Sequence, residues 1–250
     1  MVDPLHFERR ADEYAAARPP YPPELWERMR ALGALEPGIA ALDLGAGSGQ
    51  ATGPLLAAGV RVTAVEPGER LAGLLRHAYP SVEVLTARAE DVELPTGAFD
   101  LVTAATSIHW MDLAVVVPKV HAALAPGGRF AVWRNVFGDP DAPVTSFRRR
   151  VAEIVGDRTA PPRPGPSAED RDATAAALTA AGLFVVEDAT SYRWRIALDA
   201  PAVGRLFSTF SDWSEPEVAR AVDAVVDLGG STIEHYSSWL LVLRPVRAAS

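Results

Sequence analysis

The chain has 250 residues, no cysteine, and 24 lysine and arginine residues against 32 aspartate and glutamate residues, for a formal net charge of −8. A chain of this length forms a sizeable core without disulfide or metal support. The missing cysteines exclude thiolate metal sites, redox dithiols and catalytic thiols. The negative charge disfavours nucleic acids and anionic membranes as partners, because phosphate groups attract a basic surface.

The first six residues carry neither the basic nor the apolar region of a secretory signal peptide. No apolar run reaches the roughly 18 residues of a membrane span. We therefore expect a cytoplasmic protein whose partner is a small molecule rather than a nucleic acid or a membrane. The sequence leaves open whether the chain is a monomer or a homodimer.

Short apolar runs alternate with helix-like stretches from residue 39 onward. Compact apolar strands separated by helices are typical of a parallel sheet that is covered on both faces. In such a sheet the carboxyl ends of the strands lie at one edge, where ligands bind. We expect strands at residues 39–44, 61–66, 82–86, 99–105 and 128–133, and helices at residues 52–58 and 69–77.

The pattern changes after residue 135. Residues 139–167 are rich in proline and glycine, which predicts an extended connection or lid. Further helices are expected at residues 170–181, 200–210 and 215–228, and long strands at residues 184–196 and 232–244. The whole pattern predicts an α/β fold with a doubly wound, mostly parallel, seven-stranded Rossmann-like sheet, an antiparallel edge strand and helical lid segments.

We expect one domain over residues 1–250, because too little chain follows the proline-rich segment for a second core. Its parts are an N-terminal lid (1–35), a cofactor-binding core (36–135), a substrate lid with a connecting helix (136–182), and C-terminal edge strands and helices (183–250).

A glycine-rich loop, Gly45-Ala-Gly-Ser-Gly49, stands between the first strand and the first helix. Glycine lets a backbone turn sharply and approach a ligand closely, and the helix start offers free N–H groups. Glu66 ends the next strand, 21 residues after Gly45, and this spacing suits a carboxylate that accepts both hydroxyls of a ribose. Together these features favour a nucleoside site over a simple packing turn.

Two residues indicate which nucleoside this loop suits. Gln50 stands where a dinucleotide fingerprint requires glycine, and no phosphate-binding G-x-x-x-x-G-K-[ST] loop is present. Asp43, just before the loop, opposes a diphosphate but favours a cation. A sulfonium ligand with an ammonium group fits this charge.

These residues resemble the motifs of class I S-adenosylmethionine-dependent methyltransferases. Residues 43–49 are similar to the first motif of that family, residues 65–67 to its acidic second motif, and residues 87–95 to its adenine-binding motif. Residues 99–110 and the N-terminal residues 7–22 resemble the small-molecule type near the trans-aconitate methyltransferase-like group. Residues 124–129 match the turn into the fifth strand.

The resemblance implies S-adenosylmethionine as the cofactor. It places Gly45 and Gly47 against the methionine part, Glu66 on the ribose, and Thr106 near the methyl group. For Tyr14 and Glu90, local roles in packing the lid and capping a turn remain open. The implied cofactor residues are Tyr14, Arg18, Asp43, Gly45, Ala46, Gly47, Gln50, Glu66, Pro67, Ala89, Glu90 and Thr106.

The acceptor site is expected at the same sheet edge. His109, just past the fourth strand, is the candidate base or orienting group, because a histidine takes up a proton near neutral pH. Candidate substrate residues are His109, Trp110, Trp133, Asn135 and Tyr236. Their alternative is a packing role. No H-E-x-x-H or EF-hand pattern is present, so we expect no metal.

The expected function is methyl transfer from S-adenosylmethionine to a small-molecule oxygen or carbon acceptor, by in-line displacement that depends mainly on positioning and desolvation. Two alternatives stay open. One is an enzyme of the same fold that uses the cofactor without methyl transfer, and the other is a non-catalytic nucleoside-binding module. The acceptor, the methylated atom and the use of a base do not follow from the sequence.

Overall fold

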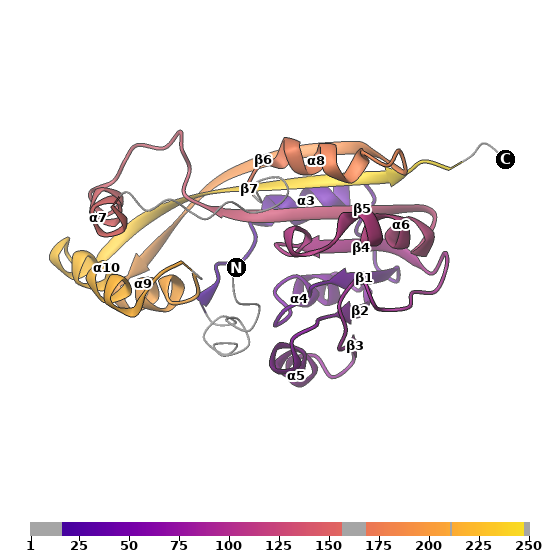
Figure 1. Cartoon of the computed structure of the whole chain (residues 1–250), viewed down its shortest axis with the longest axis horizontal. Coiled ribbons are helices and arrows are strands. Elements are labelled where there is room, and N and C mark those ends of the chain that lie inside the picture. Colours follow the sequence, from indigo (N-terminus) through magenta and orange to yellow (C-terminus); the bar gives the residue numbers. More distant parts are fainter. Residues whose placement is uncertain (1–16, 157–168, 211, 248–250) are drawn as a thin grey trace. The chain divides into compact units, whose positions relative to one another are not determined.

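The computed structural model describes residues 17–156, 169–210 and 212–247. It contains the expected seven-stranded sheet, with strand order β3-β2-β1-β4-β5-β7-β6 (Figure 1). The strands β1 to β5 are parallel neighbours, and β7 runs against β5. The bounds are β1 Ala40–Leu44, β2 Arg61–Val65, β3 Glu83–Leu85, β4 Phe99–Ala105, β5 Leu124–Phe137, β6 Phe184–Asp199 and β7 Ser231–Pro245.

The chain forms two compact units. The sheet unit comprises Tyr21–Asn135, Arg163–Tyr192 and Ser238–Ser250, and the helical unit comprises Met1–Pro20, Val136–Pro162 and Arg193–Ser237. The strands β5, β6 and β7 contribute residues to both. Each unit is compact by itself. The expectation of one domain over the whole chain stays a prediction.

The parallel strands of the sheet unit end at a common edge. Their register pairs Leu44 with Val65, Val65 with Leu85, and Ala105 with Trp133. The central strand β1 is buried from Ala41 to Leu44, as expected for a strand that is covered on both faces. This register brings the loops that follow β1, β2 and β4 to one side of the sheet, where Gly45, Glu66 and Thr106 lie.

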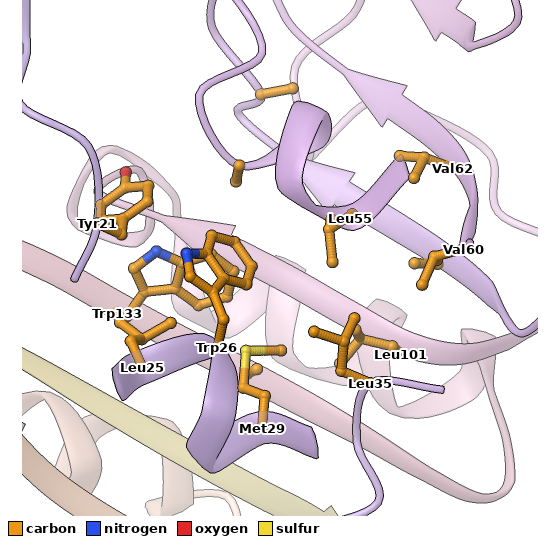
Figure 2. Close-up of a cluster of buried hydrophobic side chains, with 14 of the residues drawn as sticks. Tyr21, Leu25, Trp26, Met29, Leu35, Leu55, Val60, Val62, Leu101 and Trp133 are labelled. Carbon is orange, nitrogen blue, oxygen red and sulfur yellow. The ribbon is translucent and has the colours of Figure 1, made fainter. Parts of the chain in front are cut away.

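The helices of the sheet unit cover a continuous apolar core. One helix within the predicted N-terminal lid contributes the fully buried Leu25 and Met29 to this core. Leu55 and Trp133 from other elements are fully buried in the same core (Figure 2). Burial of such side chains stabilises the unit by about 1.5–3 kcal/mol each. The helices are α3 Pro23–Ala31, α4 Thr52–Ala57, α5 Glu69–Ala78, the 3-10 helix Ile108–Trp110, α6 Leu113–Ala123 and α8 Arg171–Thr179.

The helical unit has its own apolar core around Phe147, Val203, Phe207 and Val225. It contains α7 Ser146–Val155, α9 Ala200–Phe207 and α10 Glu215–Asp227. The expectation of an extended connection over residues 139–167 was wrong for α7. Thr145 caps this helix by accepting a hydrogen bond from the amide of Arg148 at 3.1 Å.

Two further expectations concern residues outside the described part of the chain. The proline-rich residues 161–166 lie in the undescribed segment 157–168, and the N-terminal motif before residue 17 lies in the segment 1–16. Among the described residues, no helix combines the length and the apolar character needed to cross a membrane.

Candidate functional site

The glycine-rich loop folds tightly onto the ends of β1 and β2. The amides of Gly45 and Ala46 both donate to the carbonyl of Val65, at 2.8 and 3.1 Å. Gly45 and Gly47 have φ angles of +66° and +58°, which side chains rarely adopt. A Cβ on Gly45 would lie 2.6 Å from the Cβ of Ser107, whereas one on Gly47 would meet nothing within 4 Å. The loop therefore has a packed side at Gly45 and an open side at Gly47.

The carboxylate of Glu66, which the sequence assigns to a ribose, is held by two backbone amides. Its Oε2 accepts from the amide of Gly47 at 2.8 Å, and its Oε1 accepts from the amide of Gly68 at 2.9 Å. The side chain is 6% exposed. Two amide bonds fix the orientation of this carboxylate.

Asp43 lies beneath the loop and is fully buried. Its Oδ2 accepts from the hydroxyl of Thr52 at 2.7 Å, and its Oδ1 accepts from the hydroxyl of Thr103 at 2.9 Å. Burial raises the pKa of Asp43, and the two hydroxyl bonds oppose this rise. The carboxylate therefore joins β1 to β4 and to the start of α4.

The segment after β3 is tied to the segment before α6. Ala89 is buried, and Glu90 accepts from the amide of Asp112 at 2.8 Å and from Arg88 at 3.3 Å. Lys119 donates to the carbonyl of Glu90 at 2.6 Å. Burial raises the pKa of Glu90, but these hydrogen bonds outweigh it, and the net pKa is lowered. The Glu90 carboxylate thus binds the amide of the residue that caps α6, and its assignment to the cofactor stays a prediction.

Thr106, directly after β4, holds an unusual backbone conformation. Its φ is +56°, the one positive value at a non-glycine residue of the described chain. Such conformations cost roughly 1–3 kcal/mol and persist where the surroundings impose them. The amide of Thr106 donates to the carbonyl of Trp133 at 2.8 Å, and its hydroxyl lies 3.0 Å from that of Tyr21. Strain is therefore held at a position that the sequence assigns to the cofactor.

His109 and Trp110 lie in the 3-10 helix that follows. Their rings are 4.8 Å apart, and Trp110 is 45% exposed, unusually high for a tryptophan. The terminal nitrogen Nη1 of Arg134 lies 3.2 Å from Nδ1 and 3.3 Å from Nε2 of His109. Because arginine only donates hydrogen bonds, the imidazole nitrogen that it meets accepts one. Arg134 and Trp110 thus place a cation and an exposed aromatic ring near His109, just after β4.

The other predicted residues of the sheet unit have different surroundings. Trp133 is fully buried, with ring centroids 5.4 Å from Trp26 and 5.7 Å from Tyr21, so it is a core residue. The sequence placed Trp133 at the end of a strand, whereas β5 continues to Phe137. Asn135 accepts at Oδ1 from the hydroxyl of Ser238 at 2.7 Å. Ala46 is buried, Gln50 is half-buried and Pro67 is exposed.

Two of the predicted residues belong to the helical unit. Arg18 donates to the carbonyl of Thr209 at 3.3 Å and lies over the ring of Phe210. Tyr236 is buried and stacks on Trp194, with the ring centroids 4.7 Å apart. Tyr14 lies outside the described residues.

Sequence reasoning missed several residues that support this site: Tyr21, Thr52, Thr103, Ser107 and Asp112. Tyr21, Thr103 and Ser107 lie within segments that resemble family motifs, but the sequence assigned none of the five a role, because they act through contacts with other segments or through caps. Ser107 donates from its hydroxyl to the carbonyl of Leu44 at 2.7 Å, which ties the end of β4 to the glycine loop. In the described ranges no group of three or more His, Asp or Glu side chains is arranged to hold a metal ion.

Comparison with known proteins gives the class of this domain. Residues 42–132 match the model of a methyltransferase domain family. A putative type II methyltransferase from Anaeromyxobacter dehalogenans has a similar structure, with a TM-score of 0.61, 26% identity, and coverage of 92% of this chain and 97% of that one. The matched segment contains the end of β1, the glycine loop, Glu66 and Thr106. Residues 42–132 are therefore similar to methyltransferase domains.

Two relatives in sequence carry the same class of name. An uncharacterised methyltransferase from Mycobacterium tuberculosis is 35% identical over 152 residues, which are 61% of this chain and 59% of the relative. A malonyl-[acyl-carrier protein] O-methyltransferase from Serratia marcescens is 28% identical over 49% of this chain and 48% of its own length. The chain thus spans less than two thirds of the length of these relatives.

Proposed function

We propose that the chain transfers the methyl group of S-adenosylmethionine to a small-molecule acceptor, at an oxygen or carbon atom. The observation that carries the proposal is the buried Glu66 carboxylate, oriented by the amides of Gly47 and Gly68 at the end of β2. A carboxylate in this position suits the two hydroxyls of a ribose. The name of the Serratia relative, an O-methyltransferase, supports an oxygen acceptor.

The residues of the site fit this cofactor. The open space at Gly47 lets a ligand approach the backbone closely, where any side chain would intrude. Asp43, fully buried between two threonine hydroxyls, positions the loop rather than contacting the ligand. When bound, the cofactor supplies a methyl group on a positively charged sulfur, already activated for in-line displacement.

The protein's own contribution is position and desolvation. Glu66 fixes the nucleoside, and Thr106 lines the cofactor beside the strained turn after β4. We assign His109 to orienting the acceptor, because Arg134 faces its ring nitrogens. Arg18, Tyr14 and Tyr236 stay proposed ligand residues, and the trans-aconitate methyltransferase-like group stays the proposed subgroup.

The test of this function is release of S-adenosylhomocysteine from S-adenosylmethionine, in the presence of a panel of small carboxylic acids, phenols and acidic C–H compounds. Release that depends on an acceptor supports methyl transfer. Cofactor binding with no acceptor-dependent release across the panel favours the alternative of cofactor use without methyl transfer.

A further inference from the structure

Tyr21 links the segment before α3 to the strained residue after β4. Its hydroxyl lies 3.0 Å from the hydroxyl of Thr106, within hydrogen-bond distance. The ring is buried, and it meets Trp26 and Trp133 edge to face at centroid distances of 6.3 and 5.7 Å. Figure 2 shows the Tyr21 ring beside these two tryptophans, with its hydroxyl pointing away from them. The ring is thus fixed by packing, and the hydroxyl has a defined direction.

Thr106 is held from two sides. Its amide is bound to the carbonyl of Trp133 at 2.8 Å, and its side-chain hydroxyl meets Tyr21. Threonine has no intrinsic preference for a backbone φ of +56°, so these contacts must maintain that conformation. Trp133 takes part in both, since its ring packs on Tyr21 and its carbonyl accepts from Thr106.

The residue after Thr106 contacts the strand end and the glycine loop. Ser107 donates to the carbonyl of Leu44 at 2.7 Å. The Cβ of Ser107 occupies the space that a side chain at position 45 would need, 2.6 Å from an ideal Cβ on Gly45. A shift of the turn at Thr106 therefore moves atoms that pack directly on the glycine loop.

We propose that Tyr21 is a positioning residue for the cofactor site: its hydroxyl holds Thr106 in the left-handed conformation, and Ser107 transmits this position to Gly45. The proposal rests on the proposed cofactor site, and it adds a residue from outside the glycine loop and the β2 carboxylate. It assigns no contact between Tyr21 and the ligand.

The chain offers a matched control. Tyr192 is also a tyrosine packed against the same apolar core, and its buried hydroxyl has no hydrogen-bond partner among the described residues. Tyr21→Phe and Tyr192→Phe therefore remove the same atom from the same core. Only the first removes a hydrogen bond to the turn after β4.

The experiment combines calorimetry of S-adenosylhomocysteine binding with hydrogen–deuterium exchange of the ligand-free protein. We expect Tyr21→Phe and Thr106→Val each to weaken binding by about fivefold, as loss of one hydrogen bond implies. The double variant should lose no more than either single variant, because the two substitutions break one interaction. Tyr192→Phe, which leaves the hydroxyl of Tyr21 in place, should bind like the wild type.

Exchange is measured over residues 105–111. Tyr21→Phe should raise it, and Tyr192→Phe should leave it unchanged. Wild-type affinity in Tyr21→Phe, additive losses in the double variant, or equal exchange in the two tyrosine variants would overturn the proposal. If the wild type itself does not bind S-adenosylhomocysteine, the proposed function fails, and the exchange measurement alone decides the role of Tyr21.

Discussion

The guanidinium of Arg134 lies within 3.3 Å of both ring nitrogens of His109. A neutral imidazole has one nitrogen that accepts and one that donates, and arginine requires the accepting one. A general base would become an imidazolium, a second cation beside this guanidinium. This geometry favours His109 as a group that orients the acceptor.

Replacement of His109 separates these two roles by magnitude. A general base contributes about 10²- to 10⁴-fold to a rate, so we expect His109→Ala to lower turnover by less than about 100-fold. Its affinity for the cofactor should change little. Steady-state kinetics between pH 6 and 8 and calorimetry check this, with the exposed His77→Ala as control. A loss above about 100-fold would instead identify His109 as the base.

The two loop glycines are expected to differ in their tolerance of a side chain. Gly45→Ala adds a methyl group 2.6 Å from the Cβ of Ser107 to the cost of a positive φ, whereas Gly47→Ala has the positive φ alone. We expect Gly45→Ala to lower the free energy of unfolding by about 2–4 kcal/mol and Gly47→Ala by about 1 kcal/mol. Urea unfolding measures both values. Equal destabilisation would show that Ser107 does not pack on the loop as described.

Gly47→Ala should nevertheless lose cofactor affinity, because its Cβ enters the open side of the loop. Calorimetry is expected to show a larger loss of binding than of stability for this variant. Wild-type affinity would place the ligand elsewhere.

A pH effect is expected in the helical unit. Burial raises the pKa of Glu234 to about 7 from its usual 4.5, although Arg148 opposes this from 2.7 Å. Between these two values the folded state holds a proton that the unfolded state has lost. The contribution of Glu234 to the free energy of unfolding is therefore full below pH 4.5 and falls by about 3 kcal/mol as the pH rises to 7.

Glu234→Gln removes this titration. The glutamine amide replaces a carboxyl group that lies beside the half-buried Arg148, so the slope with pH is compared and not the absolute stability. Urea unfolding at pH 4.5, 5.5, 6.5 and 7.5 should show a steeper decline for the wild type than for the variant. Parallel curves would show that Glu234 keeps an ordinary pKa.

The sequence predicted the parts of the site that depend on short-range spacing. The strand, the glycine loop and Glu66 follow one another within 30 residues, and their order alone indicates the ligand edge of a parallel sheet. Helix α7 also had local signals, a capping Thr145 and buried Phe147 and Val151 one turn apart. The surrounding prolines and glycines obscured them.

Contacts across the sheet could not be predicted in the same way. Thr103 reaches Asp43 only because β4 pairs with β1 in one particular register, and Tyr21 reaches Thr106 over 85 residues. Trp133 shows a second limit, since the sequence did not reveal that β5 continues to Phe137, nor that this side chain points into the core. Such directions depend on packing, which no single segment encodes.

The central claim is that Glu66 holds the nucleoside of the cofactor, and calorimetry of S-adenosylmethionine binding tests it most directly. Glu66→Ala and Glu66→Gln should each lose about 1–3 kcal/mol of binding free energy, because a buried carboxylate donates no proton and accepts from both hydroxyls. Glu69→Gln, an exposed carboxylate three residues away, is the control and should bind like the wild type. Undiminished affinity in both Glu66 variants would contradict the account.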